Sequence, residues 1–233
     1  MTWYYSPLAL LVAPVKYLLN QMRQLLGARD SPTQIFGGNL ATLSPKYAKD
    51  EEILADILQE FQMQTTGFVS INAHAWDQDY SKITDIGVCT WREYSFKHVT
   101  KSSYHWRIRE NMSLKNIYVP NEPDIFAFGS TKIINEFHIA QVIDSVLEPF
   151  IAEFPKVIVV GYDIKSTMHL LHTKWKPPES IVFLDTQKLW QIRNHHSDRV
   201  DLERALETTP AANYERRLLH NAGNNARYIL ELI

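Results

Sequence analysis

Length, composition and charge describe a chain that folds around a core. It has 233 residues, of which 45 % are hydrophobic, 12 % aromatic and 21 % charged, a balance that excludes a disordered chain. The formal net charge of −2 excludes the strong overall basicity of proteins that hold duplex nucleic acid by electrostatics alone. Cys89 is the single cysteine, so neither an intramolecular disulfide nor a cysteine-based zinc site can form. This cysteine usage fits a reducing compartment, and we expect an intracellular protein, nuclear or cytoplasmic.

Residues 1–49 are predicted to be an appendage, made of an amphipathic helix and an arm. Pro7, Pro14 and Lys16 interrupt the apolar stretch near the N-terminus, so no membrane span is expected there. After Pro14, apolar residues recur at helical spacing as far as Gly27, which indicates an amphipathic helix. We expect this helix to pack on its own domain or on a second copy, with an interfacial membrane helix as the alternative. The interface candidates are Trp3, Tyr4, Leu18, Leu19, Met22 and Leu25.

Residues 50–233 are predicted to form one α/β domain. Three consecutive strands are expected first, followed by a segment in which helices and strands alternate. The expected strands are 67–72, 83–91, 103–108, 156–160 and 180–184. The expected helices are 50–61, 131–150, 164–173, 186–193, 199–206 and 214–232. An antiparallel meander followed by parallel strands and flanked by helices indicates a ribonuclease H-like mixed sheet.

Five short strings occur in an order typical of one nuclease superfamily. They are Ile83–Val88, His105–Asn111, Gly161–Ile164, Leu184–Leu189 and His220–Ala226. In these strings the chain resembles the DEDDh exonuclease superfamily over residues 66 to 233. It most resembles the fungal branch related to the great-for-full-DEAD-box-activity protein of messenger-RNA export. The resemblance implies a site in which four carboxylates hold two divalent metal ions and a histidine acts as general base.

The chain departs from the superfamily at each of the four carboxylate positions. The family's Asp-x-Glu motif at a strand end maps onto Asn72 and His74, and a later family Asp maps onto Thr167. His220 matches the general base, but Asn225 replaces the Asp five residues after it. Magnesium prefers hard oxygen ligands, so a site whose ligand charge falls from about −4 to 0 is expected to hold no metal and no cofactor. The resemblance therefore implies a pseudoenzyme.

Two other groups of residues keep a metal site open as an alternative. Asp77 and Asp79 form an Asp-x-Asp pair downstream of the first motif, and a register shift would bring them to the first carboxylate positions. They lie in an expected turn, and two of the four positions would still be uncharged. His169 and His172 are spaced i, i+3 on an expected helix and offer two zinc ligands. The more ordinary interpretation of both pairs is a solvated surface.

Basic residues near the expected substrate groove suggest contact with nucleic acid. Arg107 and Arg109 alternate along an expected strand, which places both guanidinium groups on one face. The binding candidates are Arg107, Arg109, Lys165 and Arg193, interleaved with Tyr104, Trp106, Tyr118 and Trp190. This mixture suits phosphate contact and base stacking on single strands, and it equally suits an ordinary surface over an aromatic core. His74 and His220 are both expected at the former active site, where they could share a proton, an anion or a metal.

One function and two alternatives follow from the residues and the resemblance. We expect a non-catalytic pseudo-exonuclease that acts as a binding or scaffolding module in RNA metabolism, with single-stranded RNA in the former groove. The first alternative is a protein-interaction or self-association scaffold that uses the N-terminal helix and binds no nucleic acid. The second alternative is a residual metal-dependent 3′–5′ exonuclease.

Overall fold

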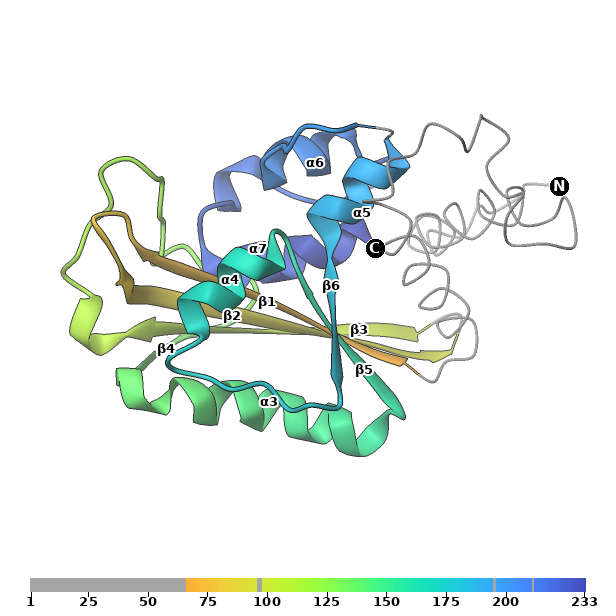
Figure 1. The fold of residues 1–233 in the computed structure, drawn as a ribbon, viewed down its shortest axis with the longest axis horizontal. Coiled ribbons are helices and arrows are strands. Elements are labelled where there is room, and N and C mark those ends of the chain that lie inside the picture. Colours follow the sequence, from red (N-terminus) through yellow and green to blue (C-terminus); the bar gives the residue numbers. More distant parts are fainter. Residues whose placement is uncertain (1–65, 96–97, 195, 211) are drawn as a thin grey trace, which may run out of the picture.

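The computed structural model describes residues 66–95, 98–194, 196–210 and 212–233 (Figure 1). The predicted N-terminal helix, the arm and the helix at 50–61 lie outside the described residues. The same holds for the interface candidates Trp3, Tyr4, Leu18, Leu19, Met22 and Leu25, which stay predictions. In the described part of the chain, no helix is long and apolar enough to cross a membrane.

A six-stranded mixed sheet forms the centre of the domain, with the strand order β4-β3-β2-β1-β5-β6. The strands are β1 (Thr66–Trp76), β2 (Asp79–Ser95), β3 (His98–Ile108), β4 (Thr131–Ile134), β5 (Lys156–Gly161) and β6 (Ile181–Asp185). β2 pairs antiparallel with both β1 and β3, while β4 is parallel to β3, β5 to β1, and β6 to β5. An antiparallel meander extended by parallel strands confirms the expected ribonuclease H-like α/β fold.

Helices cover both faces of this sheet (Figure 1). The α-helices are α3 (Ile139–Glu153), α4 (Ile164–Leu171), α5 (Thr186–Arg193), α6 (Leu202–Thr208) and α7 (Ala222–Ile229). Short 3₁₀ helices are η4 (Arg109–Asn111), η5 (Glu136–His138), η6 (Arg216–Leu218) and η7 (Leu230–Leu232). Apolar side chains of α3 and α4 pack on one face, and those of α7 pack on the other. The central strands are therefore buried between two helical layers.

Alternation along β1 assigns different chemistry to its two faces. Val69 and Ile71 belong to the apolar core beneath α3 and α4. On the other face, the Ser70 hydroxyl donates a hydrogen bond to the Ala226 carbonyl of α7. Asn72 and His74 follow Ser70 at intervals of two residues, so they continue this face. Polar side chains of β1 thus lie on the side of the sheet that α7 covers.

Gly87 of β2 permits a close approach between the sheet and α7. A Cβ atom at Gly87 would come within 2.0 Å of the Ala222 carbonyl oxygen, so a larger residue would push the helix away. Gly87 is also the partner of Asn72 in the β1–β2 register. The first turn of α7 is therefore held directly beside the polar end of β1.

The prediction of a helix over residues 131–150 is wrong at the N-terminal end of that range. Residues 131–134 form β4, which pairs in parallel with the end of β3, and α3 begins only at Ile139. Two isoleucines and a threonine in four residues favour a strand once a partner edge is present. So short a strand has no periodicity of its own, and its pairing partner is what defines it.

The helix expected at 214–232 is also shorter than its apolar pattern suggests. His220 has a φ of 69°, a left-handed conformation that ends any continuous helix before α7. Asn221 then caps α7 by accepting a hydrogen bond from the Asn224 amide at 3.1 Å. The neighbouring helix, expected at 199–206, begins later as α6, because Asp201 is its N-cap.

Candidate functional site

Three of the four positions to which the resemblance assigns carboxylates meet at the C-terminal half of β1. The Asn225 amide nitrogen of α7 lies 3.5 Å from Asn72 Oδ1 and 3.2 Å from His74 Nε2. Asn225 is 8 % exposed, whereas 20 % of the His74 side chain is exposed. We call these residues the Asn72–His74–Asn225 cluster; it is a polar site that solvent reaches at the histidine.

The two remaining sequence-predicted positions do not join this cluster directly. Thr167 is buried on α4, a helix that contacts β1. His220 precedes α7, and its carbonyl oxygen accepts a 2.7 Å hydrogen bond from the Glu122 amide. Among the described residues, no hydrogen bond or ion pair links the side chain of Thr167 or His220 to the cluster. The predicted sharing of a group by His74 and His220 therefore has no contact to support it.

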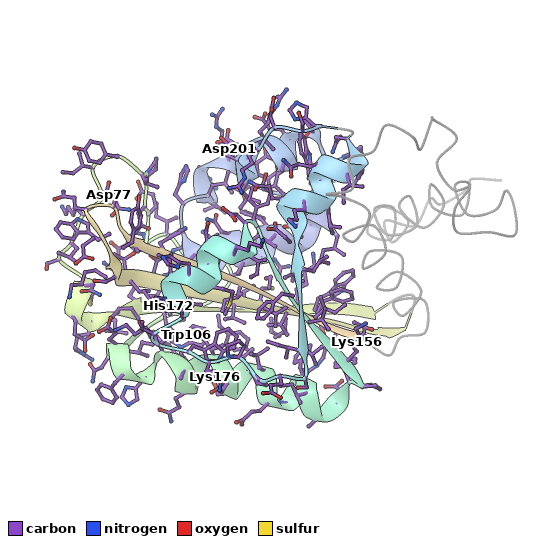
Figure 2. The ribbon with its side chains drawn as sticks, viewed as in Figure 1. Asp77, Trp106, Lys156, His172, Lys176 and Asp201 are labelled. Atoms are coloured by element: carbon purple, nitrogen blue, oxygen red, sulfur yellow. The ribbon has the colours of Figure 1, made fainter. Side chains whose placement is uncertain are left out.

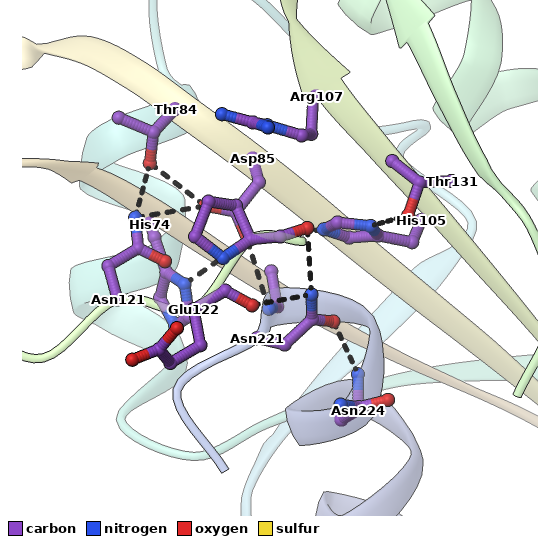
Figure 3. Close-up of polar contacts among 12 residues, drawn as sticks. His74, Thr84, Asp85, His105, Arg107, Asn121, Glu122, Thr131, Asn221 and Asn224 are labelled. Atoms are coloured by element: carbon purple, nitrogen blue, oxygen red, sulfur yellow. Dashed lines mark hydrogen bonds and ion pairs between the residues drawn. The ribbon is translucent and has the colours of Figure 1, made fainter. Parts of the chain in front are cut away.

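A buried carboxylate that was not among the predicted site residues lies beside His74. Asp85 is opposite His74 in the β1–β2 register and is fully buried. Its Oδ2 atom lies 3.3 Å from His74 Nδ1 and 3.2 Å from His105 Nε2, and it accepts a 3.0 Å hydrogen bond from the Ala222 amide (Figure 3). Its Oδ1 atom accepts a 2.8 Å hydrogen bond from the Thr84 hydroxyl. A lone acid inside an apolar strand was the available signal, because buried acids require partners.

Asp85 and His74 stabilise each other's charged form. Burial by itself raises the pKa of a carboxyl group, but the charge of His74 and hydrogen bonds from His105 hold the pKa of Asp85 well below its usual range. Burial also opposes a charge on His74, but the Asp85 carboxylate outweighs it and raises the pKa of His74. The other nitrogen of the buried His105 lies 2.9 Å from the Thr131 hydroxyl. The site thus contains an internal anion that favours an imidazolium at its solvent-reached side.

The loop between β3 and β4 packs against the N-terminus of α7 and completes this network. Asn121 donates from its amide to Asp85 Oδ1 at 3.4 Å. Asn221, the N-cap of α7, donates to the carbonyl oxygens of Glu122 and Pro123 at 3.1 and 3.2 Å. The Asn221 contacts connect segments 99 and 98 residues apart. They fix the position of α7, and hence of Asn225, relative to His74.

The donor atoms of the cluster do not fit the two divalent ions of the DEDDh exonucleases. The cluster offers two amides and one imidazole where hard, charged oxygen ligands are needed. The neighbouring carboxylate, Asp85, is already bonded through both of its oxygens. In the part of the chain that the structure describes, no group of three or more His, Cys, Asp or Glu side chains is placed to hold a metal ion. His169 and His172 stack with ring centroids 5.3 Å apart and gain no third ligand there.

The alternative carboxylate pair, Asp77 and Asp79, is engaged in local structure. Asp77 Oδ2 accepts hydrogen bonds from the backbone amides of residues 117–119, and the Asp79 carboxylate accepts one from the Ser81 amide at 3.0 Å. Figure 2 shows Asp77 at the turn between β1 and β2. β1 extends from Thr66 to Trp76, and its pairing with β2 is irregular after His74. Asp77 and Asp79 therefore lie beyond the end of β1 and are occupied by these local hydrogen bonds.

Arg107 and Arg109 do not form the predicted pair on one strand face. β3 ends at Ile108, and Arg109 belongs to η4, where its Nε atom donates to Asn135 Oδ1 at 3.0 Å. Arg107 is tied to the loop by an ion pair with Asp124, and its side chain is only 13 % exposed. The expectation is wrong because the strand ends between the two residues. Arg107 holds the loop in place rather than presenting a free guanidinium group.

The other basic and aromatic candidates are divided between surface and core. Lys165 and Arg193 are exposed on α4 and α5, and their binding role stays a prediction. Trp106 and Trp190 are buried, and Trp106 lies between the sheet and α3 (Figure 2). Tyr118, in contrast, is 80 % exposed in the β3–β4 loop. Trp106 and Trp190 therefore belong to the core and are not free to stack on nucleic-acid bases.

Comparison with models of known families identifies the domain. Residues 67–233 match the family DEDDh_C, described as DNA polymerase III subunit epsilon-like, C-terminal domain. The chain belongs to this family. Its matched segment begins at the start of β1 and includes every described element. The fold is therefore a DEDDh exonuclease-like domain of the ribonuclease H-like superfamily.

Individual similar proteins are more distant. The chain is 25 % identical over 195 residues to the uncharacterized nucleolar protein C2C4.08 of Schizosaccharomyces pombe. The matched region covers 80 % of this chain and 74 % of the relative. Among solved structures, it is similar to E. coli exonuclease I in complex with a 5cy-dA13 oligonucleotide, at 13 % identity and a TM-score of 0.41 over 72 % of this chain. A product-bound exonuclease I structure gives 11 % identity and a TM-score of 0.44 over the same share. The chain spans about 40 % of the first of these exonuclease I chains.

Proposed function

We propose that this DEDDh exonuclease-like domain binds nucleic acid without metal-dependent catalysis, as a binding or scaffolding module in RNA metabolism. The proposal is carried by the non-acidic residues Asn72, His74, Thr167 and Asn225, which stand at the four positions to which the resemblance assigns carboxylates. Two-metal hydrolysis needs those charges to hold the ions that activate water and stabilise the leaving oxygen. Their loss also removes electrostatic repulsion between the site and a phosphate group, which favours binding without cleavage.

RNA and a nuclear location are proposed on separate grounds. The five strings shared with the superfamily most resemble the fungal branch related to a messenger-RNA export protein, and we propose that branch for this chain. The relative from Schizosaccharomyces pombe carries the name of a nucleolar protein. A nuclear protein that contacts single-stranded RNA agrees with both of these likenesses.

A combined binding and cleavage assay tests the proposal. The full chain is mixed with a short, 5′-labelled single-stranded RNA, first with EDTA and then with magnesium or manganese. We expect fluorescence anisotropy to report binding in EDTA that weakens with added salt, and gels to show no shortening in either metal. Shortening that requires metal and disappears in the His220→Ala variant would establish a residual exonuclease instead. Binding that is absent from every RNA tested would refute the nucleic-acid role.

Thermal melting with metal ions gives an independent test of the degenerate site. A ligand that binds the native state raises the melting midpoint, and the shift grows with the logarithm of the ligand concentration above its Kd. We expect no shift at millimolar magnesium, manganese or calcium. A large shift would show that an unconventional metal site exists and would contradict the proposed loss of metal binding.

Protein docking is a second candidate function, because the domain displays an apolar tip. The tip consists of Tyr80, Ile117, Tyr118 and Val119, which are 63, 68, 80 and 51 % exposed. Asp77 holds the backbone of residues 117–119 from within, so these side chains are not needed to order the loop. Rigid exposed apolar and aromatic side chains are typical anchors of protein interfaces.

Sedimentation of the full chain and its variants tests this second function. If the tip mediates self-association, Tyr118→Ser combined with Ile117→Ser lowers the sedimenting mass while the melting temperature changes little. The N-terminal helix is the other proposed contact. Removal of residues 1–27 without change in mass or in bound partners would exclude that helix as the interface.

A further inference from the structure

His74 combines a possible positive charge with access to ligands at a position where the family places a metal-binding carboxylate. Its Nδ1 atom faces Asp85 Oδ2 at 3.3 Å, and its Nε2 atom faces the amide of Asn225 at 3.2 Å. With 20 % of its side chain exposed, His74 is accessible to a ligand, whereas Asn225 is buried. Within the cluster, His74 is also the side chain that can be cationic.

Protonation of His74 leaves two donors directed at the same space. When the ring is neutral, Nε2 accepts the hydrogen of the Asn225 amide. When the ring is protonated, Nε2–H and the Asn225 amide both donate, so an acceptor oxygen must receive their hydrogens. The geometry of the site therefore calls for an oxygen next to Nε2 whenever His74 is charged.

The Asn225 side chain does not supply that oxygen at low cost. Its Oδ1 atom is buried and has no hydrogen-bond partner among the described residues. Rotating the amide would bring Oδ1 to Nε2, but it would give up the contact with Asn72 and bury an amide nitrogen where Oδ1 now lies. An oxygen from outside the protein satisfies both donors and leaves these contacts in place.

The charged groups around His74 do not neutralise its imidazolium on the side that solvent reaches. The titratable and charged groups drawn around His74 in Figure 3 are Asp85 on β2, His105 and Arg107 on β3, and Glu122 in the β3–β4 loop. Asp124 of the same loop pairs with Arg107, and His220 accepts a backbone hydrogen bond from Glu122. Asp85 lies behind the ring, fully buried, and Arg107 pairs with Asp124. Glu122 is exposed, so solvent and salt screen its charge. On α4, the buried Thr167 is uncharged, and Lys165 and His169 are exposed.

We propose that the imidazolium of His74 and the amide of Asn225 together bind a phosphate oxygen of a single-stranded nucleic acid. The inference rests on the proposed function and names the contact through which it operates. Nε2 and Nδ2 donate hydrogen bonds to the phosphate, and Asp85 acts as a positioning residue that orients the ring through Nδ1. Hydrogen bonds between a charged donor and phosphate are the strong kind. A proton on His74 takes the electrostatic place of the metal ions that the family uses.

Binding of a labelled single-stranded RNA in EDTA, across pH about 6 to 9, tests the contact. Wild-type affinity falls as pH rises through the pKa of His74, because the imidazolium is lost. His74→Gln binds about tenfold or more weakly at the acidic end and loses most of the pH dependence. The matched control, His169→Gln, removes an exposed histidine on α4 and behaves as the wild type. Equal affinities for wild type and His74→Gln would overturn the inference.

Nitrogen-detected NMR of the wild-type imidazoles keeps the test decisive if His74→Gln fails to fold. Inorganic phosphate and the RNA are titrated separately, and the His74 ring is assigned through scalar correlations that link its nitrogens to the Cβ and backbone signals of residue 74. A shift of Nε2 with both ligands indicates that any phosphate suffices, whereas a shift with RNA alone indicates a phosphodiester within a strand. A His74 ring that responds to neither ligand overturns the contact.

The two proposals fail in different ways. Wild-type protein that binds no RNA at any pH refutes the proposed function and this contact together. RNA binding that survives His74→Gln unchanged refutes the contact and leaves the proposed function standing. RNA binding that requires added metal refutes the replacement of metal by a proton.

Discussion

The two faces of β1, β2 and β3 bury different kinds of side chains and are stabilised by different interactions. Beneath α3 and α4, the side chains of Ile71, Ile86 and Trp106 pack in an apolar core. Beneath the first turn of α7, the same strands carry His74, Asp85 and other polar groups in a bonded network, beside an apolar cluster that includes Phe68 and Trp91. The first face is stabilised by area removed from water, which has no preferred direction. The second is stable only if each partner is correctly placed, so its chemistry depends on register as well as residue type.

The largest expected effect comes from the apolar face. Trp106→Ala removes a large buried side chain and should lower the free energy of unfolding by about 3–5 kcal/mol. Urea unfolding followed by circular dichroism measures it. Because no titratable group is removed, the loss should be the same at acidic and alkaline pH. A loss below about 1 kcal/mol would show that the apolar face does not carry the stability assigned to it.

Asp85→Asn should have the next largest effect and is directed at the polar face. The amide keeps the shape of the carboxylate but removes its negative charge. That charge attracts the His74 ring and strengthens the hydrogen bonds that Asp85 accepts from His105 and the Ala222 amide. Loss of hydrogen bonds to a charged acceptor should cost about 1.5–3 kcal/mol in unfolding experiments. Asp124→Asn is the matched control, since the Asp124 side chain is 78 % exposed and should change stability by less than about 0.5 kcal/mol. Equal effects of the two variants would refute the central role of Asp85.

Changing the pH tests the contribution of the polar face to stability, because Asp85 and His74 titrate there and no residue of the apolar core is altered. The pKa of Asp85 is lowered on folding, so its stabilising contribution is present above its ordinary value of 3.8 and is lost as pH falls through the folded value. The pKa of His74 is raised, so its contribution is complete below 6.5 and is lost as pH rises through the folded value. In thermal melts, we expect the stability to be highest between about pH 3.8 and pH 6.5. His74→Gln should flatten the alkaline side, and an unchanged profile would contradict the pairing.

The smallest effect is expected for Arg107→Ala. Its partner Asp124 is largely exposed, and exposed ion pairs contribute about 0–1 kcal/mol. Because Arg107 is engaged with the loop, its removal should weaken RNA binding less than Arg109→Ala does. Anisotropy titrations of the two variants measure the difference. A stronger loss of RNA affinity in Arg107→Ala would restore the original assignment of this residue to phosphate contact.

Elements with a strong local pattern could be predicted from the sequence. α5 occupies the expected residues 186–193, and β5 and β6 lie within one residue of their expected bounds. β4 could not be predicted, because four residues become a strand only when the edge of β3 is beside them. α7 was overestimated, because nothing local to His220 reveals the left-handed backbone that ends the preceding helical pattern.

The candidate site was predictable in part. The alignment of motifs pointed to Asn72, His74 and Asn225, which the fold brings into contact. Asp85 was hidden, although it lies within one of the strings that carried the resemblance. Its partners include a residue of β1, a residue of β3 and a backbone amide 137 positions away. No periodicity connects such distant groups.

The sequence by itself determined the α/β pattern and the likeness to the DEDDh exonucleases, and it predicted non-acidic residues at the four positions to which the resemblance assigns carboxylates. Only the tertiary structure decided what those positions became. Antiparallel register places His74 opposite Asp85, and the close approach at Gly87 lowers the first turn of α7 onto the same carboxylate. Charge stabilisation acts between groups that are near in space, so the cationic character of His74 arises from the fold and cannot be read from its neighbours in the chain.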